Sequence, residues 1–206
     1  IPPFEQSIYV LRSKVERKNI KFFLNKDSKK NKIHLYASGG MIFENKSYDC
    51  LIDEALKYKE KGYLGWKFRP KVPITNLSHE ERIENPPDFD VKKLLFFCEK
   101  IRKKVGDDFN LMIDFGCRIK NFKKTIKLFD ALHSLNFLFV EEPFKRKLSK
   151  YLEFDQNYKN KIIAAGENFT DYRIFSQFSK IKNVKYIQPD TNLLTFRDLL
   201  QIKKLK

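Results

Sequence analysis

Short apolar segments bounded by turn residues recur along the chain, and segments of helical periodicity lie between them. The apolar segments cover residues 32–40, 63–70, 109–116, 136–143, 161–168 and 184–190. Apolar residues at helical spacing occur over residues 48–62, 91–106, 122–136, 171–183 and 193–206. Strands and helices therefore alternate, which predicts an α/β fold with a parallel sheet, because parallel neighbours need a long crossover connection.

Three carboxylates each end one of the apolar segments. Asp114 and Glu141 are 27 residues apart and Glu141 and Glu167 are 26 apart, about the length of one strand, one helix and two loops. Because the carboxyl ends of parallel strands meet at one edge of a sheet, we expect these side chains to lie together. Carboxylate oxygens are the ligands that Mg²⁺ prefers, so this pattern predicts a magnesium site.

Five segments resemble the barrel domain of the mandelate racemase and muconate lactonizing enzyme branch of the enolase superfamily. In chain order they are GWKFR (65–69), VGDDFNLMIDFG (105–116), FVEEP (139–143), AAGEN (164–168) and IQPD (187–190). The resemblance implies a (β/α)8 TIM barrel with about six βα units in this chain. Residues 1–31 would form the end of an α+β capping domain and a linker helix, and residues 32–206 would form strands one to six of the barrel.

The resemblance also implies roles for individual residues. It makes Asp114, Glu141 and Glu167 the ligands of Mg²⁺, which agrees with the spacing argument. A single strand-end carboxylate is better explained as a helix cap or the partner of a lysine, but the three together, with Asp190 and Lys67, favour a metal site.

Other positions match the catalytic and substrate-binding residues of the family. The Lys-x-Lys pair after strand two is matched by Lys67 and Arg69, and the Asp that orients a catalytic His is matched by Asp190. Ser38 and Asn168 match positions that contact the substrate.

Two departures from the family pattern bear on the reaction. The second member of the lysine pair usually removes a proton, whereas Arg69 stays protonated near neutral pH. Gly116 stands where relatives frequently carry Asn, which removes a substrate contact. A racemase needs a base on each face of the substrate carbon, whereas a dehydratase can work with the His–Asp face alone. Arg69 therefore favours dehydration, with Lys67 and Arg69 binding the substrate carboxylate or the enediolate.

The three histidines do not replace the catalytic one. His34 opens the first strand, His79 lies in a polar loop and His133 lies in a predicted helix. We expect the catalytic His on a strand after Lys206, and the chain to be an interior piece of a longer protein.

The expected activity is that of a Mg²⁺-dependent acid-sugar dehydratase. The proton α to the carboxylate leaves, the metal stabilises the enediolate, and loss of the β-hydroxyl gives a 2-keto-3-deoxy acid. The alternatives are a racemase, epimerase or cycloisomerase of the same superfamily, or a catalytically inactive fragment that binds a metal. The expected partner is a small carboxylate substrate, and relatives are commonly homo-oligomers.

Composition limits the other classes of partner. The formal net charge is +16 over 206 residues. The lysines are scattered rather than clustered, so we do not expect nucleic-acid binding. The positive electrostatic field of the protein would attract an anionic sugar acid. No apolar segment is long enough to cross a bilayer, so no membrane partner is expected. Cys50, Cys98 and Cys117 lack metal-ligand spacing and read as reduced cytoplasmic thiols.

One loop is longer than the others. Residues 70–90 contain four prolines and follow the second strand at the predicted catalytic face. Such a loop has two possible interpretations. It is either a lid or specificity element, or a surface elaboration without catalytic consequence.

Overall fold

A computed structural model describes residues 2–24, 33–40, 47–70, 78, 81 and 89–205. Most of the long 70–90 loop, with His79, lies outside the described residues. The predicted domain boundary between residues 31 and 32 lies outside them as well, so that boundary stays a prediction.

The strands form one sheet in chain order, and this confirms the predicted parallel α/β fold. The pairs from β1–β2 to β4–β5 are parallel. The strands are β1 (Ala37–Ser38), β2 (Gly65–Phe68), β3 (Asn110–Asp114), β4 (Phe137–Glu141), β5 (Ile163–Ala165) and β6 (Val184–Ile187). Asp114 and Glu141 are the last residues of β3 and β4, so both lie at the edge where the sequence places them.

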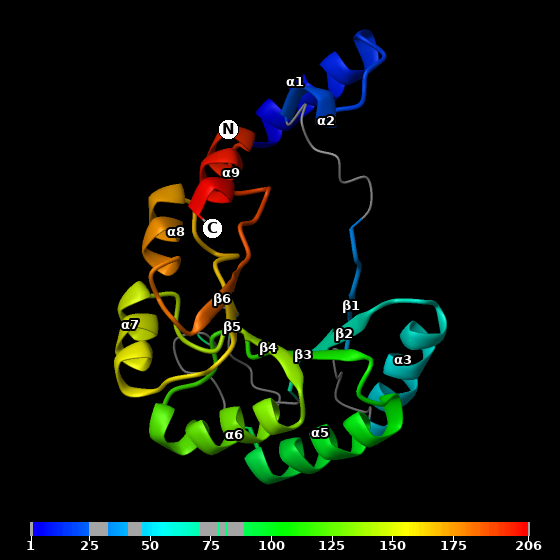
Figure 1. Ribbon diagram of the computed structural model, residues 1–206, viewed down its shortest axis with the longest axis vertical. Helices are drawn as coiled ribbons and strands as arrows, with labels where there is room; N and C mark the ends of the chain where they lie inside the picture. The colour runs from blue at the N-terminus through cyan, green and yellow to red at the C-terminus, as the bar shows by residue number, and fades with distance from the viewer. Residues whose placement is uncertain are drawn as a thin grey trace. The chain divides into compact units, whose positions relative to one another are not determined.

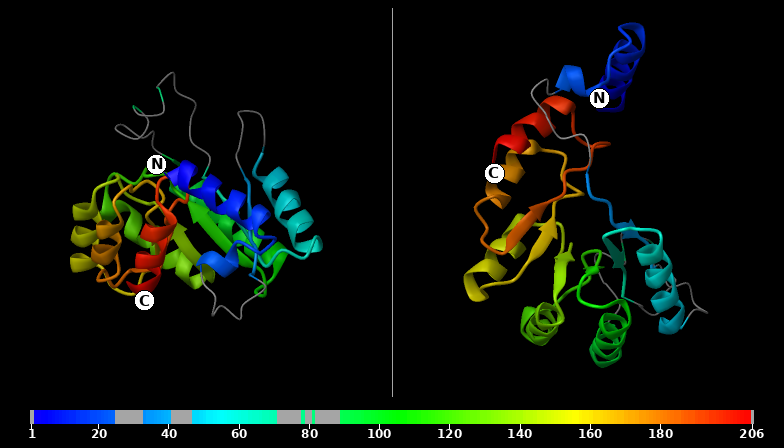
Figure 2. Two further views of the ribbon diagram at one scale, coloured as in Figure 1. Left: turned by 90° about the horizontal axis from the view of Figure 1, so that it is seen from above. Right: turned by 45° about the vertical axis from the view of Figure 1, so that its right-hand side comes forward.

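Helices precede, connect and follow the strands along the chain. They are α1 (Pro2–Val15), α2 (Lys21–Leu24), α3 (Tyr48–Glu60), α5 (Val91–Val105), α6 (Phe122–Ser134), α7 (Leu148–Asn157), α8 (Tyr172–Phe178) and α9 (Phe196–Ile202), followed by the 3-10 helix η1 (Lys203–Leu205). In Figures 1 and 2, α3, α5, α6 and α7 lie along one side of strands β1 to β5. This is the arrangement of the outer helices of a β/α barrel.

Two helical regions differ from the sequence expectation. Helix α7 has no counterpart among the predicted helices, and its buried residues are Tyr151 and Phe154. The segment 5–24 reads as one helix, but α1 ends at Val15 and α2 begins at Lys21. Arg17 has a φ of 49°, and a left-handed residue ends an α-helix.

The chain divides into two compact units. The terminal unit contains residues 1–33, 166–181 and 187–206, and the sheet unit contains residues 34–165 and 182–186. In the terminal unit, Phe175, Leu194 and Ile202 form a buried core. Helix α1 is joined to α9 there, because the Glu5 carboxylate accepts a hydrogen bond of 2.6 Å from the backbone N–H of Phe196.

The sheet unit has an inner cluster of buried side chains formed by Met112, Phe139 and Ala164 from three neighbouring strands. Met112 is two residues before Asp114, and Phe139 is two residues before Glu141. Because alternate residues of a strand share a face, both carboxylates lie on the same face as this cluster, at the end of the strands.

A buried arginine joins the loops at the other end of these strands. Arg102 on α5 is 7% exposed. Its Nε donates to Leu135 O at 2.8 Å, and its Nη2 donates to Asn136 O at 3.0 Å. Its Nη1 donates to the carbonyls of Gly106 and Phe109 at 2.6 and 2.8 Å. One guanidinium therefore satisfies four backbone carbonyls, and Arg102 holds the start of β3 and the start of β4 together.

We expect Arg102→Met to lower the free energy of unfolding by about 3 kcal/mol, because an apolar side chain leaves buried carbonyls without donors. Urea unfolding followed by circular dichroism measures this loss. Lys93→Met on the same helix is the control, since Lys93 is 78% exposed in its pair with Asp90 and surface pairs contribute little. Equal stability of the two variants would contradict the role assigned to Arg102.

Candidate active site at the strand ends

Strand register brings the predicted site residues of the sheet unit together. Asp114 and Glu141 are direct Cα partners in the β3–β4 pair. Phe68 is the partner of Ile113, so Arg69 follows β2 beside Asp114. Lys67 stands next to Ser38 on one side and Met112 on the other.

An irregularity in β4 produces this alignment. Leu111 pairs with Phe137, but the next residue, Met112, pairs with Phe139, so the register shifts by one residue. Without the shift Asp114 would stand beside Val140, and Glu141 would lie on the other face of the sheet. The bulge therefore places the two carboxylates side by side.

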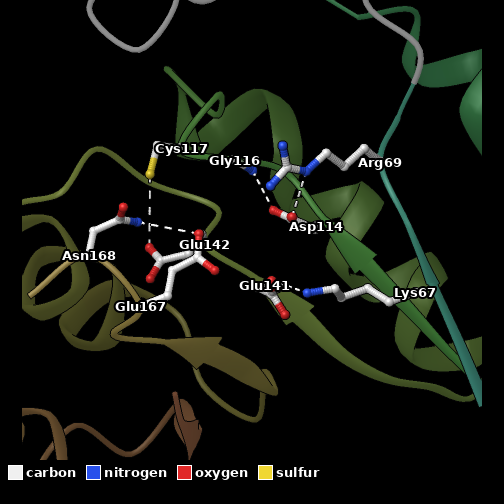
Figure 3. A network of polar contacts seen from close by, with 9 residues as sticks. All are labelled: Lys67, Arg69, Asp114, Gly116, Cys117, Glu141, Glu142, Glu167 and Asn168. Atoms are coloured by element: carbon white, nitrogen blue, oxygen red, sulfur yellow. Dashed lines mark hydrogen bonds and ion pairs between the residues drawn. The ribbon is translucent and has the colours of Figure 1, made fainter. Parts of the chain in front are cut away.

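Both carboxylates are buried and each is paired with a cation. Asp114 is 2% exposed and Glu141 is 0% exposed. Arg69 Nε contacts Asp114 Oδ2 at 2.7 Å, and Lys67 Nζ donates to Glu141 Oε1, as Figure 3 shows. The backbone N–H of Gly116 donates to the other Asp114 oxygen, Oδ1, at 2.8 Å. An ionised carboxylate is very costly to bury alone, so the cations make this arrangement stable.

The pKa of Lys67 shows how strongly the two groups interact. Burial acts to lower this pKa, but the negative charge of Glu141 and its hydrogen bond to Nζ outweigh burial, so the pKa of Lys67 is raised above its ordinary value. Lys67 also lies 5.8 Å from the centre of the Tyr36 ring. In this pairing Lys67 is an ammonium that can donate a proton but cannot accept one.

The remaining predicted site residues belong to the terminal unit. Asn168 Nδ2 donates to Glu167 Oε1 at 3.4 Å, and Asp190 Oδ1 accepts from the backbone N–H of Asn192 at 2.7 Å. Gly166, just before Glu167, has a φ of 126°, a conformation that favours glycine. Since these residues belong to another unit, the role of Glu167 beside Asp114 and Glu141 stays a prediction.

The two buried residues of the sheet unit have the chemical type that a hard divalent cation prefers. Asp114 and Glu141 place carboxylate oxygens at neighbouring strand ends, and each carboxylate already forms an ion pair with a cationic side chain. Across the ranges that the structure describes, no three or more His, Cys, Asp or Glu side chains are grouped as they would be around a metal ion.

Two of the three histidines, His34 and His133, lie within the described residues, and both lie away from this site. His34 is exposed before β1, and His133 is exposed on α6. Neither stands at the carboxyl end of a strand, in agreement with the sequence expectation.

A second network lies directly behind Glu141. The sequence predicts Glu142 as a structural partner rather than a ligand, but it does not predict the residues that Glu142 contacts. Glu142 is 0% exposed, and its Oε2 accepts a hydrogen bond of 2.7 Å from the hydroxyl of Tyr151 on α7. Cys117 Sγ lies 3.9 Å from the same oxygen. The Glu-Glu pair was a visible signal, but Tyr151 was not, because no helix was predicted between β4 and β5.

Comparison with known protein families shows to which family this chain belongs. Residues 51–197 match the family model described as Enolase C-terminal domain-like. The chain belongs to this family. Its membership in the enolase superfamily, of the mandelate racemase and muconate lactonizing enzyme type, confirms the resemblance seen in the five sequence segments.

One curated relative is a D-gluconate/D-galactonate dehydratase from Picrophilus torridus, which is 28% identical over 162 residues. The match covers 76% of this chain and 39% of the relative. The chain thus spans well under half of that protein.

Solved structures share the fold. An L-talarate dehydratase from Polaromonas sp. JS666, complexed with Mg and L-glucarate, matches with a TM-score of 0.75 and 20% identity, over 96% of this chain and 50% of that one. A 3,6-anhydro-D-galactonate cycloisomerase from Zobellia galactanivorans matches with a TM-score of 0.69 and 23% identity, over 90% and 46% of the two chains. The reactions of these proteins differ, so the likeness shows the fold alone.

Two further sequence expectations concern the membrane and the thiols. Among the described residues, no helix combines the length and the apolar character that crossing a bilayer requires. All three cysteines are free, as predicted, with Cys50 exposed and Cys98 and Cys117 buried.

We expect one thiol per folded chain to react with Ellman's reagent near pH 8. Burial and the nearby negative charge of Glu142 raise the pKa of Cys117 to about 12, and burial raises the pKa of Cys98 far above its usual value. Only a thiolate attacks the reagent, so Cys50 should be the reactive residue. Cys50→Ser should abolish the reaction, and rapid modification of that variant would contradict the burial of the other two.

We expect Lys67→Met to lower the free energy of unfolding by about 3 kcal/mol in the presence of EDTA, because it leaves the Glu141 carboxylate buried without its cation. Urea unfolding measures the loss. The double variant Lys67→Met/Glu141→Met should recover most of it, since no buried charge then lacks a partner. Equal losses in the single and double variants would show that the pair is not coupled. Lys150→Met is the matched control, as Lys150 forms an exposed pair with Glu153.

Proposed function

We propose that this protein is a Mg²⁺-dependent dehydratase of a sugar acid, which gives a 2-keto-3-deoxy acid. The observation that carries the proposal is the alignment of two buried carboxylates, Asp114 and Glu141, at neighbouring strand ends, each beside a cation. Membership in the enolase superfamily and 28% identity to a sugar-acid dehydratase support it.

Three carboxylates of this chain would hold the metal. Asp114 and Glu141 come from the sheet unit, and Glu167, two residues after β5, is proposed as the third ligand. When bound, Mg²⁺ supplies positive charge next to the substrate carboxylate and the enediolate that forms on loss of the α-proton.

The two cations of the site have electrostatic roles in this proposal. Arg69 stays protonated throughout, because a guanidinium does not lose its proton near neutral pH. Lys67, whose pKa is raised in its pairing with Glu141, is likewise an ammonium. Both would bind the substrate carboxylate or the developing negative charge rather than remove a proton.

In this proposal the α-proton leaves from the face of the substrate opposite Lys67 and Arg69. Asp190 is the residue of this chain that would orient the catalytic His on that face, as the family pattern implies. Ser38, whose Cα partner is Lys67, and Asn168, which donates to Glu167, are proposed to contact substrate hydroxyl or carboxyl groups.

Two alternatives have specific support. A cycloisomerase shares the fold, and a racemase or epimerase would use the same metal site, but Arg69 cannot serve as the second base that racemisation requires. A protein that binds a cation without turnover also fits, because Arg69 and Lys67 are both committed to carboxylates.

We expect keto-acid formation from at least one member of a panel of aldonic and aldaric acids, measured as the semicarbazone. EDTA should abolish the activity and Mg²⁺ should restore it. Glu167→Gln should lower kcat about a thousand-fold or more, since a lost metal ligand removes several kcal/mol of transition-state stabilisation. Glu153→Gln, a surface change on α7, should have no effect.

Each alternative gives a different result in the same experiment. Exchange of the α-proton with deuterated solvent, without keto acid, would indicate a racemase or epimerase. Metal binding with neither exchange nor keto acid would indicate a non-catalytic relative. Unchanged activity of Glu167→Gln would overturn its assignment as a metal ligand.

A further inference from the structure

We infer that Glu142 is a positioning residue, whose buried carboxylate holds the turns after β3 and β4 together and so sets the spacing of Asp114 and Glu141. This inference rests on the proposed function, because the two groups it positions are proposed metal ligands. The Glu142 carboxylate contacts Tyr151 and Cys117, whereas the Glu141 carboxylate contacts Lys67, so Glu142 is not counted among the proposed ligands.

The carboxylate of Glu142 is fully enclosed. Its exposed fraction is 0%, and those of its neighbours Tyr151 and Cys117 are 1% and 2%. The Tyr151 hydroxyl donates to Oε2 at 2.7 Å, and Cys117 Sγ lies 3.9 Å from that oxygen. Figure 3 shows Glu142 directed toward Cys117 while Glu141 extends toward Lys67. Burying a carboxylate behind the site is costly, and its contacts connect the turn after β3, the turn after β4 and helix α7.

Backbone geometry shows what these contacts hold in place. Glu142 has a φ of 38° and Cys117 a φ of 67°, both in the left-handed region that non-glycine residues rarely adopt. A backbone hydrogen bond joins the two strained residues: the N–H of Cys117 donates to the carbonyl of Glu142 at 2.6 Å. The N–H of Glu142 donates to Ala164 O on β5 at 3.0 Å. Such conformations persist only where surrounding contacts enforce them.

The two turns directly follow the proposed metal ligands in the chain. Glu141 immediately precedes Glu142, and Asp114 is three residues before Cys117. The N–H of Phe115 also donates to Glu141 O at 3.0 Å, which ties the two strand ends together. Mg²⁺ requires near-octahedral geometry at short distances, so a small change in these turns should weaken its binding.

The sulfur of Cys117 acts here as a weak donor. Burial and the charge of Glu142 raise the pKa of Cys117 to about 12, so the thiol keeps its proton near neutral pH. Its S–H can therefore face the Glu142 carboxylate without repulsion.

Two variants test this role through metal binding, without substrate. Tyr151→Phe removes one hydroxyl and keeps the ring that packs 5.3 Å from Phe144, and Glu142→Gln removes the charge at nearly constant shape. We expect Mn²⁺, measured by electron paramagnetic resonance, to bind about 10-fold more weakly to Tyr151→Phe and up to about 100-fold more weakly to Glu142→Gln. Near-ultraviolet circular dichroism should show that both variants are folded.

The matched controls are Glu153→Gln on α7 and Tyr172→Phe, whose side chain is partly exposed at 41%. Both should bind Mn²⁺ as the unmodified protein does. A lower melting temperature with unchanged Mn²⁺ affinity in both test variants would show a merely structural role and overturn the inference. Absence of Mn²⁺ binding by the unmodified protein would instead overturn the proposed function, and the inference with it.

Discussion

The pairing of buried carboxylates with cations at the ends of β2, β3 and β4 is the interaction on which the site depends. Asp114 and Glu141 are almost completely buried, and each is paired with a cation, Arg69 or Lys67, that offsets the cost of burying a negative charge. The parallel sheet makes this pairing available, because it places the carboxyl ends of all its strands at one edge. A divalent cation suits the same place, since its charge can serve both carboxylates at once.

The same pairing constrains the chemistry. A lysine held as an ammonium and an arginine that cannot lose its proton provide positive charge, but no base, on this face of the site. The fold is shared by dehydratases and a cycloisomerase, so the fold does not select the reaction. The proposed dehydration rests instead on Arg69, because a guanidinium cannot act as one of the two bases that racemisation needs.

Much of the fold could be predicted, because its signals are local. The apolar segments and the helical periods gave every strand and most helices, and the strand-end carboxylates identified the edge that carries the site. Helix α7 was missed because its buried face consists of two aromatic residues, Tyr151 and Phe154, among polar ones. The break between α1 and α2 was missed because the positive φ of Arg17 has no local signal in its residue type.

The sequence by itself determined which chemical groups are present: strand-end carboxylates, two cations and a parallel sheet that brings them to one edge. Only the tertiary structure decided how these groups meet. The one-residue register shift in β4 makes Glu141 the partner of Asp114, and the buried contact between Tyr151 and Glu142 joins a helix to the turn behind the site. Both depend on pairing between segments distant in the chain, and the energy of such pairing lies in packing and hydrogen bonds that no local pattern records.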